Sequence, residues 1–291
     1  MSPTIRTLQQ RIKAQPTSDG DGVQIYRIAG RQLNDSLDPF LLLDEFRSDD
    51  SADYIGGFPP HPHRGFETVT YMLNGQMLHR DHMGNEGLLT DGGVQWMTAG
   101  RGVIHSEMPQ QIEGLMHGFQ LWLNLPASEK MKPARYQYFS TDDFPLVELT
   151  TGGKIKVVAG QLSTTSDPDE PVFKTANEVI NGPVKGVATD PVYFDLQLNA
   201  GEQWSQSVPL DHTVLLYVYQ GSTAELSQQE LGVYTNGNAV KIMAGGEGVK
   251  ALFLAASPLR EPVKQYGPFV MNTEKEIRQA IDDYRMGRLT E

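Results

Sequence analysis

The pattern of apolar and polar positions along this chain consists of many short apolar runs separated by turn residues. The runs are rich in β-branched and aromatic residues, and glycine or proline recurs between them. Clear examples are Glu67–Leu73, Gly118–Leu125, Ile155–Val158, Val192–Leu198, Thr213–Tyr219 and Lys250–Ala255. Short strands bounded by turn residues at such intervals are typical of β-sandwiches and β-barrels. The pattern therefore predicts an all-β fold.

One segment near the C-terminus has helical periodicity instead. Thr273 and Glu276 have the spacing of a capping box, which marks the start of a helix. The apolar residues that follow at helical spacing are Ile277, Ala280, Ile281 and Tyr284. Gly287 stands where a glycine commonly ends a helix. We expect one short helix over about residues 273–286.

An internal repeat divides the chain into two similar halves. A gapless shift of 146 residues aligns Tyr71 with Tyr217, Gly75 with Gly221, Val94 with Val240, Met97 with Met243, Gly100 with Gly246, Gly102 with Gly248, and Val103 with Val249. The first pairs lie in a strand that enters a glycine turn, and the others in a strand, turn and strand. We predict two tandem β-barrels, at residues 1–140 and 141–291, with the helix at the end of the second. The polar stretch Ser128–Pro145 is predicted to link them, and Leu162–Pro171 to form an exposed loop.

Two motifs in the first half place metal-ligating side chains on strands. In His61-Pro62-His63 the imidazoles lie two residues apart, so in an extended chain both project from the same face. His105-Ser106-Glu107 repeats this spacing with a carboxylate in second place. On adjoining strands of a barrel, the two motifs would direct four nitrogen and oxygen ligands at one interior point. This donor set suits Fe(II), Mn(II), Ni(II), Cu(II) or Zn(II).

The second half lacks all four of these side chains. Under the same shift, the positions of the four ligands are occupied by Ser207, Pro209, Ala251 and Phe253. Residues kept in both halves are therefore predicted to be architectural, whereas residues found in one half are candidates for chemistry.

Glu67 competes with Glu107 for the role of carboxylate ligand. It lies four residues after His63, so strand parity also turns it inward. It is a candidate ligand in place of Glu107, or an acceptor that fixes the tautomer of a ligating imidazole. From the residues alone, both alternatives stay open.

Further residues are candidates for the wall of the pocket. His117 precedes an alternating strand from which Gln120 and Trp122 would face the site, although Trp122 is equally well explained as a core aromatic. The remaining histidines, which we expect to be ordinary loop or surface residues, are His79, His82 and His212.

Composition narrows the classes of partner and environment. The net charge is −12 and no basic stripe with interleaved aromatics is present, which argues against direct nucleic-acid binding. The longest apolar runs are far shorter than a membrane-spanning helix, and the N-terminal residues lack the apolar core of a secretory signal. The absence of cysteine excludes disulfides and thiolate metal sites. We expect a cytoplasmic monomer, or a nuclear one if the source is eukaryotic.

Five segments resemble the pirin family of the cupin superfamily. They are Asp38–Phe46 (DPFLLLDEF), His61–Leu73 (HPHRGFETVTYML), Gln95–Pro109 (QWMTAGRGVIHSEMP), Gln120–Leu125 (QLWLNL) and Glu261–Thr273 (EPVKQYGPFVMNT). Together they extend from about residue 20 to the end of the chain. The resemblance implies a bicupin with metal in the N-terminal barrel alone. Cupins generally take their carboxylate from the first motif, here Glu67, but pirins take it after the third histidine, which corresponds to Glu107.

The resemblance also implies an activity. Fe(II) is the usual metal of the family, and several members open the central ring of flavonols as quercetin 2,3-dioxygenases. We therefore expect an Fe(II)-dependent dioxygenase that acts on a flavonol or a related aromatic enol and on dioxygen, with Glu107 as general base. The alternative, described for other members, is an iron-binding, redox-sensing regulator that acts through protein partners. A third reading is a purely structural metal.

Overall fold

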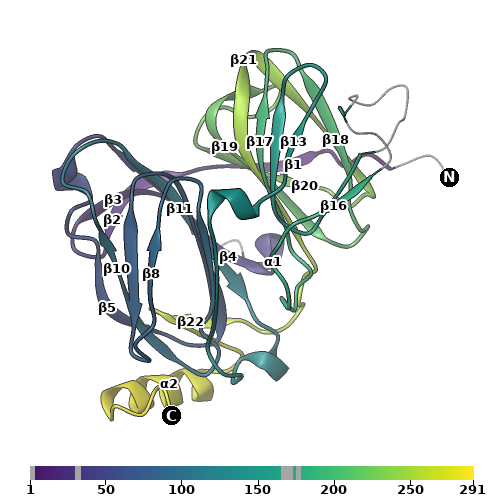
Figure 1. The fold of residues 1–291 in the computed structure, drawn as a ribbon. Coiled ribbons are helices and arrows are strands. Elements are labelled where there is room, and N and C mark those ends of the chain that lie inside the picture. Colours follow the sequence, from purple (N-terminus) through teal and green to yellow (C-terminus); the bar gives the residue numbers. More distant parts are fainter. Residues whose placement is uncertain (1–3, 30–33, 165–172, 175–177) are drawn as a thin grey trace. The chain divides into compact units, whose positions relative to one another are not determined.

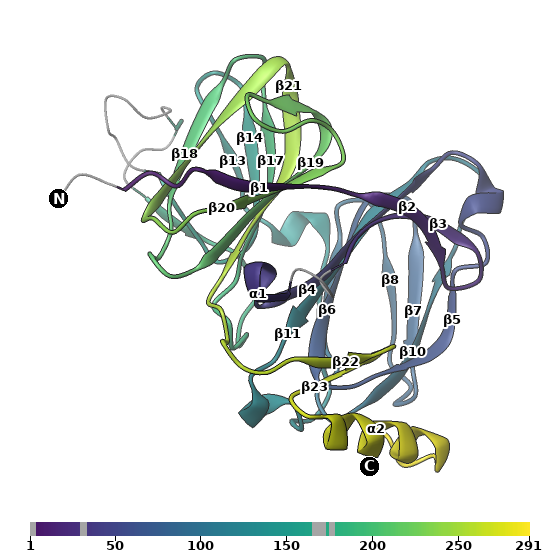
Figure 2. The same cartoon turned by 180° about the vertical axis from the view of Figure 1, so that it is seen from behind.

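The computed structural model describes residues 4–29, 34–164, 173–174 and 178–291 (Figures 1 and 2). It divides the chain into two compact units. The histidine unit comprises Gln15–Thr141 and Leu259–Glu291, and the apolar unit comprises the segment that ends at Ala14 together with Asp142–Pro258. Both units are β-structures, so the predicted all-β class with one short C-terminal helix is confirmed. Among the described residues, no helix is long and apolar enough to cross a membrane.

The histidine unit contains a large sheet, a smaller sheet and a hairpin. Its strands are β2 Gln15–Asp19, β3 Val23–Ala29, β4 Phe40–Ser48, β5 Phe58–His63, β6 Phe66–Asn74, β7 Met77–Asp81, β8 Glu86–Leu89, β9 Val94–Thr98, β10 Val103–Pro109, β11 Met116–Asn124, β12 Arg135–Phe139, β22 Lys264–Tyr266 and β23 Phe269–Met271. The seven-stranded sheet has the order β12-β9-β6-β11-β4-β3-β2, and the four-stranded sheet has the order β5-β10-β7-β8. The candidate ligands lie on β5 and β10 of the smaller sheet.

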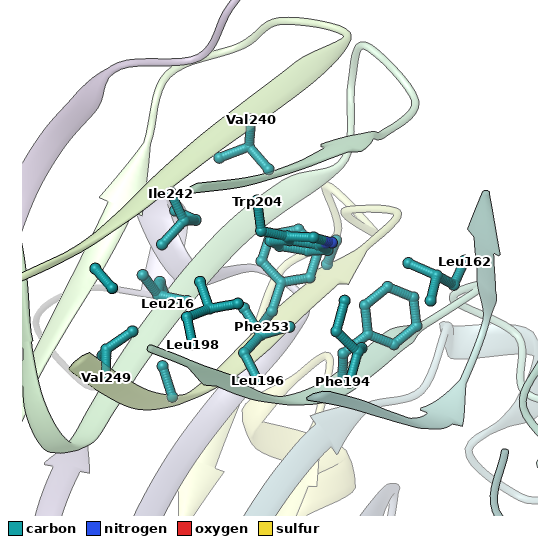
Figure 3. Close-up of a cluster of buried hydrophobic side chains, with 14 of the residues drawn as sticks. Leu162, Phe194, Leu196, Leu198, Trp204, Leu216, Val240, Ile242, Val249 and Phe253 are labelled. Carbon is teal, nitrogen blue, oxygen red and sulfur yellow. The ribbon is translucent and has the colours of Figure 1, made fainter. Parts of the chain in front are cut away.

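The apolar unit is built around one eight-stranded sheet. The strands of this unit are β1 Leu8–Lys13, β13 Leu146–Glu148, β14 Lys154–Ala159, β15 Gln161–Ser163, β16 Val179–Asn181, β17 Val192–Leu198, β18 Gln203–Ser207, β19 Thr213–Thr223, β20 Glu230–Tyr234 and β21 Ala239–Ala256. The eight-stranded sheet has the order β1-β20-β19-β21-β17-β14-β13, with β18 paired to β21, and β15 and β16 form a separate pair. Figure 3 shows its interior, where Phe194, Trp204 and Phe253 point toward one another. This unit has a continuous apolar core.

The C-terminal helix, α2 (Glu274–Arg285), has the predicted start. Thr273 caps it by accepting a hydrogen bond from the backbone N–H of Glu276, whose side chain accepts one in return from the backbone N–H of Thr273. Its apolar face packs on β23, where Ile277 and Ala280 lie beside Phe269. The other helices are the short α1 (Asn34–Leu37) and three 3₁₀ turns, Ser51–Asp53, Ala127–Glu129 and Thr141–Asp143.

The two units differ from the predicted division at residues 140 and 141, because the terminal segments are exchanged. The N-terminal strand β1 pairs with β20 of the second half, more than 200 residues away in sequence. The C-terminal helix belongs to the histidine unit, where Arg64 donates to the Asp283 carboxylate at 2.7 Å and to the Leu289 carbonyl at 2.8 Å. Long-range pairing of this kind leaves no local mark in a sequence.

The predicted linker and the predicted loop both contain strand residues. The stretch Ser128–Pro145, predicted as a linker, contains β12, which pairs with β9 inside the seven-stranded sheet. Of the predicted loop Leu162–Pro171, residues 165–171 lie outside the described residues, and Leu162–Ser163 belong to β15.

Part of the internal repeat has a structural counterpart in each unit. Tyr71 on β6 and Tyr217 on β19 are both buried, and the glycines that follow them, Gly75 and Gly221, both have positive φ, at 99° and 73°. A Cβ at Gly221 would lie 2.3 Å from the Gly248 carbonyl oxygen, so only glycine fits there. The first group of aligned residues thus has the same architectural role in both units, but the second group does not. Val94 lies on β9, which pairs with β6, whereas Val240 lies on β21, where it pairs with β18. Met97 is fully buried, whereas Met243 is 49% exposed.

Candidate metal centre

The two histidine motifs lie on adjacent antiparallel strands. β5 carries His61 and His63, and β10 carries His105 and Glu107. In the register of this pair, His105 is directly opposite His61. The register then shifts, so that Glu107 is opposite Phe58. Pairing of these strands brings the first three side chains together, as the alternation of the motifs predicted.

Three imidazoles converge on one point. The candidate ligand atoms of His61, His63 and His105 lie within 4.8 Å of one another, and the Nε2 atoms of His61 and His63 are 3.0 Å apart. Two nitrogen ligands about 2.0–2.1 Å from one ion have this separation when they subtend roughly a right angle. Among the described residues, this is the one cluster of at least three such groups that could hold a metal ion.

Burial prepares these imidazoles to act as ligands. His63 and His105 are 3% and 1% exposed, and burial together with neighbouring histidines holds the pKa of each well below its usual value. Both rings are therefore neutral near pH 7, which is the form that binds metal. His105 Nε2 has no hydrogen-bond partner among the described residues. A buried nitrogen lone pair without a donor is the feature that a cation would satisfy.

Glu107 lies near the imidazoles but outside the three-histidine cluster. Its side chain is buried, lines the same cavity as His61 and His63, and accepts a hydrogen bond from Thr70 Oγ1 at 2.9 Å. Burial raises the pKa of Glu107, and the charge of His61 opposes that shift. Thr70 Oγ1 also lies 2.6 Å from Gln120 Oε1, so Gln120 and Glu107 compete for the one proton of this hydroxyl. The structure thus places three of the four predicted ligands together and the fourth beside them.

Glu67 is engaged elsewhere. Its carboxylate accepts hydrogen bonds from Trp96 Nε1 at 3.0 Å and from Thr98 Oγ1 at 2.6 Å, and Lys132 Nζ is 3.9 Å away. It does not line the cavity, and among the described residues it makes no hydrogen bond to an imidazole. The geometry therefore gives no support to Glu67 as a ligand or as an acceptor for an imidazole.

Of the residues predicted to line the pocket, some do so and one does not. Trp122 and Gln120 line the cavity, and the Trp122 ring meets the His63 ring edge to face at a centroid distance of 5.3 Å. His117 is buried away from the cavity, and its Nε2 is 2.9 Å from Glu45 Oε1. Trp122 is both a packing residue and a wall of the site.

The cavity has a volume of about 580 Å³ and a mixed lining. Its apolar walls include Leu41, Leu42, Phe46, Phe58, Met77 and Trp122. An ion pair lies in the same wall: Arg27 Nε is 2.8 Å from Asp44 Oδ1, and Arg27 Nη2 is 2.6 Å from Asp44 Oδ2. Burial raises the pKa of Asp44 to about 6 despite this partner. Such a volume, largely apolar with a few polar groups, accommodates a small aromatic molecule.

Three histidines predicted to be loop or surface residues behave differently from one another. His82 is exposed and His212 is buried in a turn of the apolar unit. His79 is fully buried on β7, and its Nε2 is 2.6 Å from Nδ1 of His105. The prediction that His79 is a loop or surface residue was wrong. His79 lies on a strand of five residues, which is too short to stand out in the sequence pattern. Alternation from the apolar Met77, two residues earlier, is the signal that points His79 inward.

The chain is similar to known proteins over most of its length. A family model described as Pirin matches residues 22–123, and one described as Pirin C-terminal cupin domain matches residues 193–290. A Pseudomonas aeruginosa protein, provisionally named a quercetin 2,3-dioxygenase, is 48% identical over 281 residues, which cover 94% of each chain. Human pirin is 38% identical over 278 residues, covering 92% of this chain and 88% of that one. A crystal structure of quercetin 2,3-dioxygenase from Acinetobacter baumannii has a TM-score of 0.86 at 32% identity, covering 98% and 99% of the two chains.

Proposed function

This chain belongs to the pirin family, and we propose that it is an Fe(II)-dependent dioxygenase of the quercetin 2,3-dioxygenase type. Its substrate would be a flavonol or a related aromatic enol. The observation that carries the proposal is the convergence of three imidazoles beside a cavity of about 580 Å³ with a largely apolar wall. The names of the relatives from Pseudomonas and Acinetobacter support the reaction type.

The proposed ligands are His61, His63, His105 and Glu107. Three nitrogens and one oxygen suit Fe(II), and they also suit Mn(II), Ni(II), Cu(II) and Zn(II), so the identity of the metal rests on the family rather than on the donor set. When bound, the ion would act as a Lewis acid that lowers the pKa of a coordinated hydroxyl.

The protein's own residues supply binding and proton transfer. Glu107 is proposed to accept the proton of the substrate hydroxyl, because its carboxylate borders the cavity and its raised pKa favours proton uptake. The rings of Trp122 and Phe46 would hold a flat substrate and exclude water from the enolate that results. Gln120, fixed by Thr70, is placed to orient a polar substituent.

The test is anaerobic reconstitution with Fe(II), followed by quercetin and oxygen. Release of carbon monoxide and uptake of oxygen, both in proportion to the bound iron, are the expected results. Alanine at any of the four proposed ligands should abolish turnover and reduce metal content together. His117→Ala is the matched control, because His117 is a buried histidine of the same unit that does not line the cavity.

Full metal loading without carbon monoxide or oxygen uptake would contradict the enzymatic proposal. In that case the regulatory alternative would be favoured, and partner affinity would have to differ between the Fe(II) and Fe(III) forms. A single ligand variant that keeps both full metal content and turnover would remove that residue from the ligand set.

A further inference from the structure

We propose that His79 is a positioning residue that fixes the tautomer of His105, so that the Nε2 lone pair of His105 faces the metal. The inference rests on the proposed metal centre and not on the reaction performed there. His79 is 0% exposed and lies on β7, the strand that pairs with β10 on the side away from β5. It does not line the cavity, so it contacts the proposed ligand from behind.

The contact between the two imidazoles is short and specific. His79 Nε2 lies 2.6 Å from His105 Nδ1, with the ring centroids 4.8 Å apart. A neutral imidazole has one N–H and one lone pair, so a hydrogen bond between two such rings runs in one of two directions. The direction decides which atom of His105 carries its proton.

Only one direction leaves His105 able to bind a metal. If His105 donates from Nδ1, its Nε2 carries a lone pair, and this atom is the one that is buried without a hydrogen-bond partner among the described residues. If His79 donates instead, His105 must carry its proton on Nε2. That N–H would be buried without an acceptor and would occupy the position of the lone pair. The first direction is therefore required for a ligand.

The contact of His79 with Tyr138 fits the same direction of the hydrogen bond. When His79 accepts at Nε2, its proton is on Nδ1, and Tyr138 Oη lies 3.1 Å from that atom. Tyr138 belongs to β12, is 38% exposed, and has the Gln95 side chain as a further hydrogen-bonding neighbour. Gly87 on β8, opposite His79 in the register, makes room for the Tyr138 ring: a Cβ at Gly87 would lie 2.3 Å from Tyr138 Cε1.

Hydrogen bonds to the second nitrogen of a ligating histidine typically contribute 10- to 100-fold to metal affinity. In most such sites the partner is a carboxylate, a backbone carbonyl or a water molecule. Here it is a neutral imidazole, which can accept at Nε2 only when its own proton is on Nδ1, and a third group that accepts from Nδ1 favours that form. Tyr138 is in position to be that group.

The test measures Zn(II) affinity by competition with a chromophoric chelator, which requires no turnover. His79→Leu removes the acceptor and should weaken Zn(II) binding about 10- to 100-fold. His79→Gln retains a carbonyl oxygen that can accept from His105 Nδ1 and should restore most of the affinity. Tyr138→Phe should have a smaller, severalfold effect, since solvent reaches this position. His117→Leu, which also removes a buried histidine, should leave Zn(II) affinity within about twofold of the wild type.

A second measurement reads the tautomer directly. Long-range ¹H–¹⁵N NMR spectra of the metal-free protein should show His105 protonated at Nδ1 in the wild type and in His79→Gln, and a changed tautomer population in His79→Leu. Unchanged zinc affinity in His79→Leu, or Nε2 protonation of His105 in the wild type, would overturn the proposal. If His79→Leu does not fold, the glutamine and Tyr138→Phe variants decide it. Tight zinc binding without quercetin turnover would instead count against the dioxygenase alone.

Discussion

The two β-units share a framework and differ in what fills it. In the apolar unit, Phe253 pairs with Leu216 on β19 as Gln120 pairs with Thr70 on β6, so Phe253 occupies the place of Gln120. It stacks on Phe194 at a centroid distance of 5.9 Å and meets Trp204 edge to face at 5.1 Å. Leu216 likewise occupies the place of Thr70, and both Leu216 and Phe253 are fully buried. Hydrocarbon therefore occupies, in one unit, the place where the other carries polar side chains that line a cavity.

This comparison separates architecture from chemistry. Gly75 and Gly221 make the same turn in both units, and Tyr71 and Tyr217 are both buried, whereas the side chains that line the cavity are replaced by apolar ones. An apolar interior gains stability from close packing, and an interior with polar groups and open volume gives up part of that stability for a binding site. If this is so, the two interiors should differ in their contribution to the free energy of unfolding as they differ in composition.

The largest expected effect is in the apolar core. Trp204→Ala should lower the free energy of unfolding by about 3–5 kcal/mol, because the indole is fully buried among Phe194, Phe253 and neighbouring aliphatic residues. Trp122→Ala should cost clearly less, because one side of that ring already borders the cavity. Urea denaturation of the metal-free proteins measures both. Equal losses at the two positions would show that the cavity wall is as tightly packed as the apolar core.

A smaller effect, with a dependence on pH, is expected in the histidine unit. Burial raises the pKa of Asp44 from 3.8 to about 6, so between about pH 4 and pH 6 the unfolded state binds fewer protons than the folded state. The free energy of unfolding should therefore fall by up to about 3 kcal/mol from this group as the pH rises through that window.

The Asp44→Asn variant removes this titration, so its stability should vary less over the same pH range. Urea denaturation of the metal-free variant and wild type at a series of pH values measures the two slopes. Asp49→Asn, at an exposed aspartate of the same unit, is the control and should keep the slope of the wild type. A slope that is unchanged in Asp44→Asn would mean that Arg27 holds the Asp44 carboxylate ionised across the whole range.

Much of the site could be predicted because its signals are local. Strand alternation alone places His61 and His63 on one face, and the repeat shows that the second half lacks their equivalents. All six apolar runs named from the sequence lie within or almost wholly within strands. The position of Glu107 beside Thr70, rather than within the histidine cluster, depends on a register shift that no spacing reveals.

What the sequence did not predict depends on contacts between distant segments. β1 pairs with β20, and Arg64 binds the C-terminal residues Asp283 and Leu289, so the units exchange their terminal segments. The contact of His79 with His105 likewise depends on which strand pairs with β10. Spacing within a motif says which face a side chain occupies, but it does not say which strand lies next to it.

The smallest expected effect is the loss of folding stability that a buried imidazole causes in the histidine unit. His63 is 3% exposed, its ring is approached by the Pro268 backbone without a well-formed hydrogen bond, and its Nε2 faces another ring nitrogen at 3.0 Å. Because burying a polar atom without a well-formed hydrogen bond is destabilising, His63→Leu should raise the free energy of unfolding of the metal-free protein by about 1 kcal/mol while abolishing metal binding. Leucine there would contact the apolar rings of Phe66 and Trp122, which already pack against His63.

The contrasting variant is His117→Leu. It should be destabilising, because it removes one partner of the Glu45 carboxylate, at 2.9 Å. Urea denaturation in the presence of a chelator measures both variants. If His63→Leu proved as destabilising as His117→Leu, His63 would be a structural residue, and the interior of the histidine unit would carry no energetic cost for its ligands. If His63→Leu raises the free energy of unfolding and His117→Leu lowers it, the loss of stability belongs to the metal centre and not to buried imidazoles in general.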